Sequence, residues 1–153
     1  MIAQQTVFAP LKIREGVMSD QWDGYAAARR RLLADLARPS VRNPVVLSGD
    51  IHSFWVNDIK AQGEAGPTLG TEIVGTCLAA GNSPKVRYAG VRELNPHVRF
   101  ADLDHSGYAL LEVTPKAMNV DLRAVSHMTD PAATTTSLAR FVVEDRRPGA
   151  QPA

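Results

Sequence analysis

The sequence contains a single cysteine, Cys77, so an internal disulfide bond is excluded. Cys77 lies in an apolar stretch with Val74 and Leu78. This setting indicates a small buried side chain, because no activating base for a nucleophilic thiolate stands beside it. No apolar run approaches the length needed to span a bilayer, and no segment near Met1 has the order of a signal peptide. We therefore expect no membrane segment, and the compartment stays unknown.

The chain also lacks an excess of positive or negative charge. The chain of 153 residues has 17 Lys and Arg against 16 Asp and Glu, for a net charge of +1. This balance gives no indication of a nucleic-acid partner or of an acidic membrane surface. The one basic run, Arg29 to Arg31, falls in a helical pattern and is typical of a solvated helix face. A hydrophobic fraction of 44% is normal for a globular domain of this length.

Apolar periodicity predicts an α/β layer in the first half of the chain. Tyr25, Leu32 and Leu36 recur at helical spacing, and Pro39 ends that pattern, with Asp20 or Asp23 as the expected cap. Buried strands are expected at 45–48 and 71–76. Residues 51–69 are expected to hold an aromatic pair and then a polar loop, and residues 81–93 a loop with at most a short helix.

The second half of the chain is β-rich. Alternating apolar residues predict three strands, at 107–114, 118–125 and 138–143, and their short connections indicate an antiparallel meander. Residues 145–153 are charged and rich in Pro and Gly, so we expect a frayed tail. We then expect residues 1–144 to belong to one domain.

The most informative segment is Val45-Val46-Leu47-Ser48-Gly49-Asp50-Ile51-His52. An apolar strand runs into a small-residue turn, and Asp50 and His52 follow two positions apart, so both side chains can face one point beyond the strand. A carboxylate and an imidazole suit a divalent or trivalent metal. The alternative is that Asp50 caps the next element and His52 is a hydrogen-bonded loop histidine.

Two further groups of polar residues are candidates. His97 and Arg99 can belong to a loop that contacts phosphate, because a guanidinium donates two parallel hydrogen bonds; equally, they can be an ordinary loop histidine and a surface arginine. Asp102, Asp104 and His105 also resemble a ligand set in composition, but a solvated turn is the favoured interpretation. His127 is expected to be a turn residue.

Short motifs in a fixed order extend this picture over nearly the whole chain. They are Trp22-Asp23-Gly24-Tyr25, the Asp50 and His52 segment, Gly70-Thr71-Glu72-Ile73-Val74-Gly75-Thr76, Asn95-Pro96-His97-Val98-Arg99-Phe100, Gly107-Tyr108 and Val113-Thr114-Pro115. Their order and spacing resemble the C-terminal part of the alkaline phosphatase D family of PhoD-like metallophosphoesterases. In that family an upstream β-rich domain and the first metal-binding motifs precede the region matched here.

The resemblance implies a fold and an activity. The fold would be part of a metallophosphoesterase α/β sandwich, with this chain supplying about one mixed sheet and its flanking helix. The activity would be hydrolysis of phosphomonoesters or phosphodiesters, with phosphate-ester small molecules as substrates. Asp50 and His52 match the family's late ligand motif, and the implied metals are iron and calcium. Family members are often exported, to the periplasm or outside the cell.

Two alternatives stay open. The chain can be a non-catalytic remnant or binding module that lacks the upstream metal ligands, since it would hold only the C-terminal half of an active site. Independently of the resemblance, it can be a β-rich binding domain with no metal at Asp50 and His52. The phosphatase interpretation, unlike these alternatives, requires the N-terminal part of the domain to complete the active site.

Overall fold

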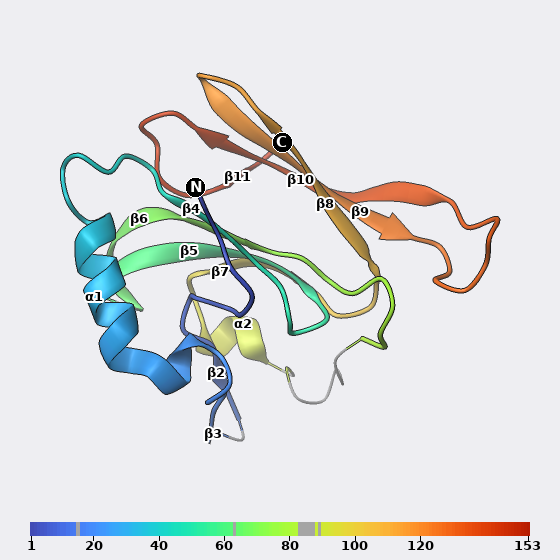
Figure 1. Cartoon of the computed structure of the whole chain (residues 1–153), viewed down its shortest axis with the longest axis horizontal. Coiled ribbons are helices and arrows are strands. Elements are labelled where there is room, and N and C mark those ends of the chain that lie inside the picture. Colours follow the sequence, from blue (N-terminus) through green and yellow to red (C-terminus); the bar gives the residue numbers. More distant parts are fainter. Residues whose placement is uncertain (15, 63, 83–87, 89) are drawn as a thin grey trace.

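The computed structural model describes the whole chain except residues 15, 63, 83–87 and 89. Its first sheet has five strands in the order β1-β4-β6-β5-β7 (Figure 1). The strands are β1 (Ile2–Ala3), β4 (Val45–Ser48), β5 (Phe54–Gln62), β6 (Ala65–Val74) and β7 (Val98–Asp102). β1, β4 and β6 run parallel, whereas β5 is antiparallel to both β6 and β7. The sheet is therefore mixed.

The second sheet is antiparallel and has the order β11-β10-β9-β8. It contains β8 (Gly107–Val113), β9 (Ala117–Val125), β10 (Thr135–Glu144) and β11 (Gln151–Pro152). A two-stranded hairpin, β2 (Lys12–Ile13) with β3 (Gly16–Val17), lies beside the first sheet. The helical elements are η1 (Trp22–Tyr25), α1 (Ala26–Leu36) and α2 (Val91–Leu94). No described helix is long and apolar enough to cross a membrane.

The first sheet is buried on both faces because alternate residues of its strands pack in opposite directions. Val45, Phe54 and Ile73 pack against Val120 and Phe141 of the second sheet. The neighbouring residues on the same strands turn the other way, toward the helices and loops: Val46 packs with α1, and Trp55 and Val74 pack with Tyr88 and Val91. The result is three layers: Figure 1 shows the second sheet above the first and α2 below it, and Phe54 is fully buried.

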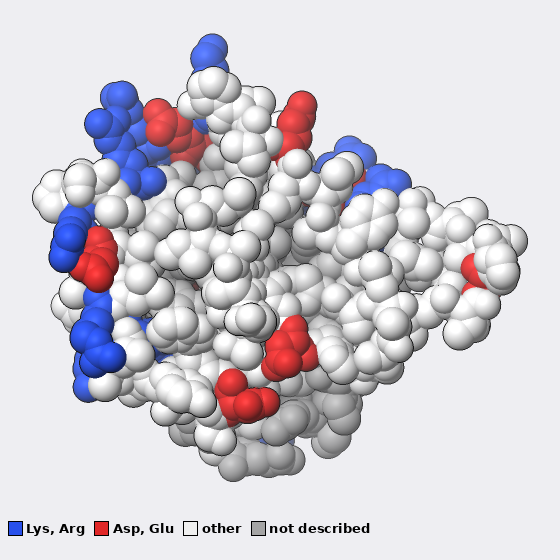
Figure 2. Space-filling view, in the orientation of Figure 1, with Lys and Arg blue, Asp and Glu red and all other residues white. Residues whose placement is uncertain are grey.

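Most expected elements are confirmed. η1 and α1 cover the helix expected from Tyr25 to Leu36, β4 covers 45–48, and β8, β9 and β10 form the antiparallel meander. The expected cap is wrong, because α1 has no side-chain cap and Asp23 instead accepts the Leu11 N–H and pairs with Arg29. Arg30 and Arg31 are exposed, and Lys and Arg gather over α1 on the left of Figure 2.

Four expectations differ from the structure. Residues 54–62 and 65–74 form the long hairpin β5–β6, where a polar loop was expected over 51–69; the strand expected at 71–76 is confirmed in part, because β6 ends at Val74. Residues 98–102 form β7 rather than a loop. The chain supplies two sheets, not one. The loop with at most a short helix expected at 81–93 is not among these differences: 91–94 form the short helix α2, and residues 83–87 and 89 lie outside the described residues.

The tail at 145–153 is the fourth difference. Gln151 and Pro152 pair with β10, the Ala153 N–H donates to the Arg140 carbonyl, and Ala150 is buried in the core between the two sheets. Pairing with β10 satisfies backbone groups that a frayed tail would leave to water. Composition alone does not reveal this pairing.

One buried carboxylate ties the first sheet to the segment that follows β1. Glu72 on β6 is 0% exposed. Its oxygens accept the backbone N–H groups of Phe8 (2.6 Å) and Ala9 (2.9 Å), the Ser48 hydroxyl of β4, and the Asn57 amide of β5 (3.0 Å). A buried carboxylate needs such donors, because burial without them is costly. Glu72 therefore fixes the position of the Phe8–Ala9 segment on the first sheet.

This arrangement predicts a pH dependence of stability. Burial raises the pKa of Glu72 above its ordinary value of 4.5, and the hydrogen bonds only partly oppose this. The folded chain then binds the proton more tightly than the unfolded chain. Its contribution to stability is present in full below the unfolded pKa and is lost as pH rises through the raised pKa.

The measurement is urea unfolding of the natural chain and of Glu72→Gln, which cannot ionise. The free energy of unfolding of the natural chain minus that of the variant should fall as pH rises from the ordinary pKa of 4.5 into the neutral range. A difference that stays constant or grows over this range contradicts the raised pKa.

Candidate active site

Several strand ends meet at one edge of the first sheet. Ser48 at the end of β4 pairs with Val74 at the end of β6, Val74 pairs with Trp55 near the start of β5, and Trp55 pairs with Ala101 near the end of β7. Hydrogen bonds join the segments that follow these strands, including Gly49 N–H to the Gln5 carbonyl (2.9 Å). Ligands in α/β proteins commonly bind beyond the carboxyl ends of parallel strands. We call this edge the strand-end edge.

Asp50 and His52 lie at the strand-end edge, in the loop directly after β4, as predicted. Both have a left-handed backbone, with φ of 73° at Asp50 and 52° at His52. Non-glycine residues adopt this region rarely, although Asp and His are enriched among those that do. Strain of this kind persists where the surrounding structure enforces it and often marks a functional site.

Each of the two side chains is held by one partner. The Asp50 Oδ2 accepts a hydrogen bond from Gln21 Nε2 (2.6 Å), and the His52 Nδ1 lies 2.9 Å from the carbonyl oxygen of Gly81. A carbonyl can only accept, so Nδ1 carries the proton and Nε2 is the basic nitrogen. Metal-binding histidines commonly donate their second ring N–H to a carbonyl in this way. Asp50 is exposed and His52 is half-buried, so both can be reached.

The donor atoms fit a metal ion, but the set is incomplete. Asp50 Oδ1 and His52 Nε2 are an oxygen and a nitrogen ligand of the kind that iron and similar ions take. A catalytic metal usually needs at least three protein ligands. Outside the gaps at 15, 63, 83–87 and 89, no group of three or more His, Cys, Asp or Glu is placed to hold an ion.

His97 and Arg99 lie away from the strand-end edge. They stand at the start of β7, whereas Asp102 at its end pairs with Phe54. His97 is 1% exposed, and its Nε2–H donates to the Pro10 carbonyl (2.7 Å). Arg99 lies 3.8 Å from Asp58. The structure therefore does not place them in a loop over Asp50 and His52, since β7 separates the two ends.

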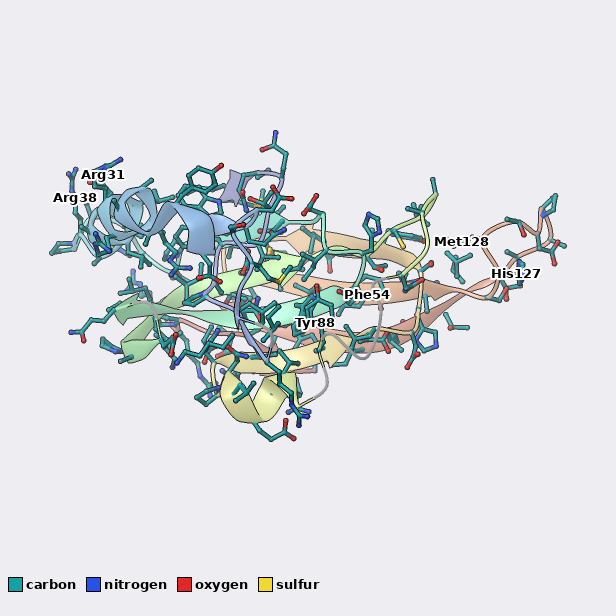
Figure 3. All side chains as sticks on the ribbon, turned by 90° about the horizontal axis from the view of Figure 1, so that it is seen from below. Arg31, Arg38, Phe54, Tyr88, His127 and Met128 are labelled. Atoms are coloured by element: carbon teal, nitrogen blue, oxygen red, sulfur yellow. The ribbon has the colours of Figure 1, made fainter. Side chains whose placement is uncertain are left out.

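The Asp102, Asp104 and His105 cluster does reach the strand-end edge. The Asp102 carboxylate accepts the backbone N–H groups of Asp104 (3.2 Å) and His105 (2.9 Å), and it also contacts the His105 ring (3.0 Å). The cluster thus forms a closed turn. His127 lies with Met128 at the tip of the β9–β10 hairpin (Figure 3), where its Nδ1 is 3.1 Å from the Thr129 hydroxyl.

The serines and aromatics near the motif have structural partners. Ser53 is buried, donates to the Ile51 carbonyl (3.0 Å) and accepts the Trp55 Nε1–H (2.7 Å), which stiffens the loop after β4. Trp22 packs edge-on against Phe8, with ring centroids 5.1 Å apart. Tyr25 is exposed and lines a hollow of about 340 Å³ with Trp22 and residues 4–6. This hollow lies beside the strand-end edge, because residues 4–6 follow β1.

Comparison with known proteins agrees with this geometry. The sequence model of the PhoD-like phosphatase family matches residues 1–122. The chain belongs to the PhoD-like phosphatase family. It is 30% identical over 158 residues to "Alkaline phosphatase D" of Bacillus subtilis (strain 168), an alignment that covers 97% of this chain and 27% of that protein. A solved structure described as "Structure of PhoD" superposes with a TM-score of 0.87 at 30% identity, covering 99% of this chain and 30% of that one.

The PhoD-like assignment confirms the resemblance and the mixed α/β fold. The family is one of phosphatase-type hydrolases and is generally metal-dependent. The chain spans less than a third of the relatives it matches. Sequence reasoning missed two residues that support the strand-end edge, Gln21 and Glu72. The sequence offered a signal for only one of them: Glu72 is a charged residue inside an apolar strand, which indicates a buried carboxylate with hydrogen-bond partners.

The burial of His97 generates a second test. Burial lowers its pKa below the ordinary value of 6.5, although the Pro10 carbonyl opposes the shift. The folded chain then binds a proton less tightly than the unfolded chain, so the stability contributed by neutral His97 is lost as pH falls below 6.5.

We expect the free energy of unfolding of the natural chain, minus that of His97→Gln, to fall as pH falls below 6.5. Gln keeps a donor for Pro10 but cannot titrate. Urea unfolding at several pH values measures this, and a difference independent of pH contradicts the assignment of His97 as a buried neutral residue.

Proposed function

We propose that this chain carries part of the active site of a metal-dependent phosphoric ester hydrolase that acts on phosphomonoesters or phosphodiesters. The observation that carries the proposal is the loop after β4. It places Asp50 and His52 in a strained backbone at the strand-end edge, each with one side-chain atom held by the protein. Membership of the PhoD-like family supports the reaction class.

Asp50 and His52 would each hold a metal ion, and iron and calcium are the ions that we propose. A bound metal lowers the pKa of water and neutralises charge on the phosphoryl oxygens. The chain's own contribution is position: Gln21 orients the carboxylate, and the Gly81 carbonyl fixes the tautomer of the imidazole. Further ligands would come from outside the described residues, because two donors are too few for a catalytic metal. His97 and Arg99 are left out of this site.

The alternative is a binding module or remnant without catalysis. It is supported by the incomplete ligand set among the described residues. The two proposals differ in what happens when the rest of the domain is present, since only a catalytic site then gains activity.

The first test compares substitutions in a full-length family protein that contains this chain. Asp50→Ala and His52→Ala should each lower kcat by about 100-fold or more and reduce bound metal, because each removes a direct ligand. Asp104→Ala and His105→Ala should change kcat little, since these residues belong to a closed surface turn. Metal content and kcat are measured for all four variants together. Loss of activity in the turn variants with retention in the other two would reverse the site assignment.

The second test uses the 153-residue chain alone. Its turnover of an aryl phosphate with added iron, calcium or manganese should not exceed that of the Asp50→Ala/His52→Ala double variant under the same conditions. The reason is that two ligands cannot fix a catalytic metal. Enzyme-like turnover by the natural chain, lost in the double variant, would show that residues 1–153 already form a complete site.

A further inference from the structure

Gln21 is a buried amide in direct contact with the candidate ligand Asp50. It stands just before η1 and is 3% exposed. Its Oε1 accepts the backbone N–H of Val7 (2.6 Å), and its Nε2 donates to the Asp50 Oδ2 (2.6 Å). A buried glutamine whose two ends both make short hydrogen bonds connects the segment after β1 to the loop after β4.

The chemistry of the partners fixes which way this amide faces. A backbone N–H can only donate, so the Val7 N–H requires the amide oxygen. The amide nitrogen is then presented to Asp50, whose carboxylate can only accept. The reverse orientation would place two donors together at Val7 and two acceptors together at Asp50. The orientation of Gln21 therefore follows from its neighbours.

The backbone segment to which Gln21 is hydrogen-bonded is itself fixed by buried side chains. The backbone N–H groups of three consecutive residues, Val7, Phe8 and Ala9, all donate to buried side chains: the first to Gln21 and the next two to Glu72. The segment cannot shift without breaking hydrogen bonds of a fully buried carboxylate. Gln21 thus has a fixed support, whereas Asp50 is exposed and lies on a strained loop.

We propose that Gln21 is a positioning residue that holds the Asp50 carboxylate through Oδ2, so that Oδ1 is the atom presented to a divalent or trivalent metal ion. This inference rests on the proposed function. Without Gln21 the exposed Asp50 side chain would sample several rotamers, and ordering it would oppose metal binding. Hydrogen-bond partners of metal ligands commonly change metal affinity by about 10- to 100-fold.

The test is a titration of the ¹⁵N-labelled 153-residue chain with Mn²⁺, whose unpaired electrons broaden nearby amide signals. In the natural chain, broadening should centre on residues 49–53. Gln21→Met keeps a buried side chain of similar length without either hydrogen bond, and it should raise the Mn²⁺ dissociation constant about tenfold. Asp50→Ala should abolish the localised broadening.

Gln4→Met is the matched control. Gln4 is also a glutamine that links the segment after β1 to β4, through Ser48 (2.7 Å). It accepts the Trp22 Nε1–H (3.0 Å), and among the described residues its side-chain partners are Thr6, Ser48 and Trp22 rather than Asp50. This substitution should lower the free energy of unfolding while leaving the Mn²⁺ dissociation constant within about twofold of that of the natural chain. Equal weakening by Gln4→Met and Gln21→Met would show a general loosening and overturn the positioning role.

A second measurement covers the case in which Gln21→Met does not fold. The side-chain NH₂ protons of Gln21 should exchange slowly in the natural chain and faster in Asp50→Ala, because one of them loses its acceptor. Unchanged exchange overturns the inference. If Gln21→Met folds and binds Mn²⁺ like the natural chain, only the positioning role fails. If the natural chain shows no broadening near residues 49–53 at millimolar Mn²⁺, the inference about Gln21 fails, whereas the proposed function, in which further ligands complete the site, is decided separately by the Asp50→Ala and His52→Ala variants of the full-length protein.

Discussion

The buried carboxylate of Glu72 is the interaction on which the rest of the first sheet depends. It gathers donors from β4, from β5 and from the segment after β1, so one side chain links three stretches that lie far apart in the sequence. Removing a buried acceptor of this kind leaves several donors unsatisfied, each at a cost of about 1–3 kcal/mol. Hydrophobic packing brings the strands together. Glu72 determines that the backbone of Phe8 and Ala9 lies over the sheet, and it fixes the position of these two residues along β6.

The site inherits its geometry from that constraint. With Phe8 and Ala9 held by Glu72, the neighbouring Val7 N–H has a fixed position, and Gln21 joins it to Asp50. A second constraint comes from the loop itself, where the buried Ser53 bonds the Ile51 carbonyl while the residues on either side of Ile51 take left-handed backbone. The strained loop is thus enforced from two directions. Both constraints hold the loop without a ligand, so a ligand of this loop would have less ordering to impose.

The sequence predicts those parts of this structure that depend on local pattern. Helical spacing predicts α1, and the apolar run from Val45 predicts β4 with Asp50 and His52 just beyond it. It does not predict β5 as a strand, because Asn57 and Asp58 interrupt the apolar pattern and are buried only through partners on other strands. The same limit explains His97, since its proximity to Pro10, 87 positions away, is a property of the fold. Gln21 and Asp50 are likewise joined across 29 positions.

The position of His97 shows that a residue is assigned to this site by the end of the strand at which it lies, and not by the residue types of its local motif. A histidine and an arginine next to a strand suit phosphate binding in composition, yet β7 runs antiparallel to β5 and carries them to the end opposite Asp102. Asp102 and His105, disfavoured by sequence, do arrive at the strand-end edge, where the Asp102 carboxylate contacts the backbone N–H and the ring of His105. What distinguishes Asp50 and His52 is therefore a combination of three properties. They lie beyond a parallel strand, both have a left-handed backbone, and the protein holds one side-chain atom of each.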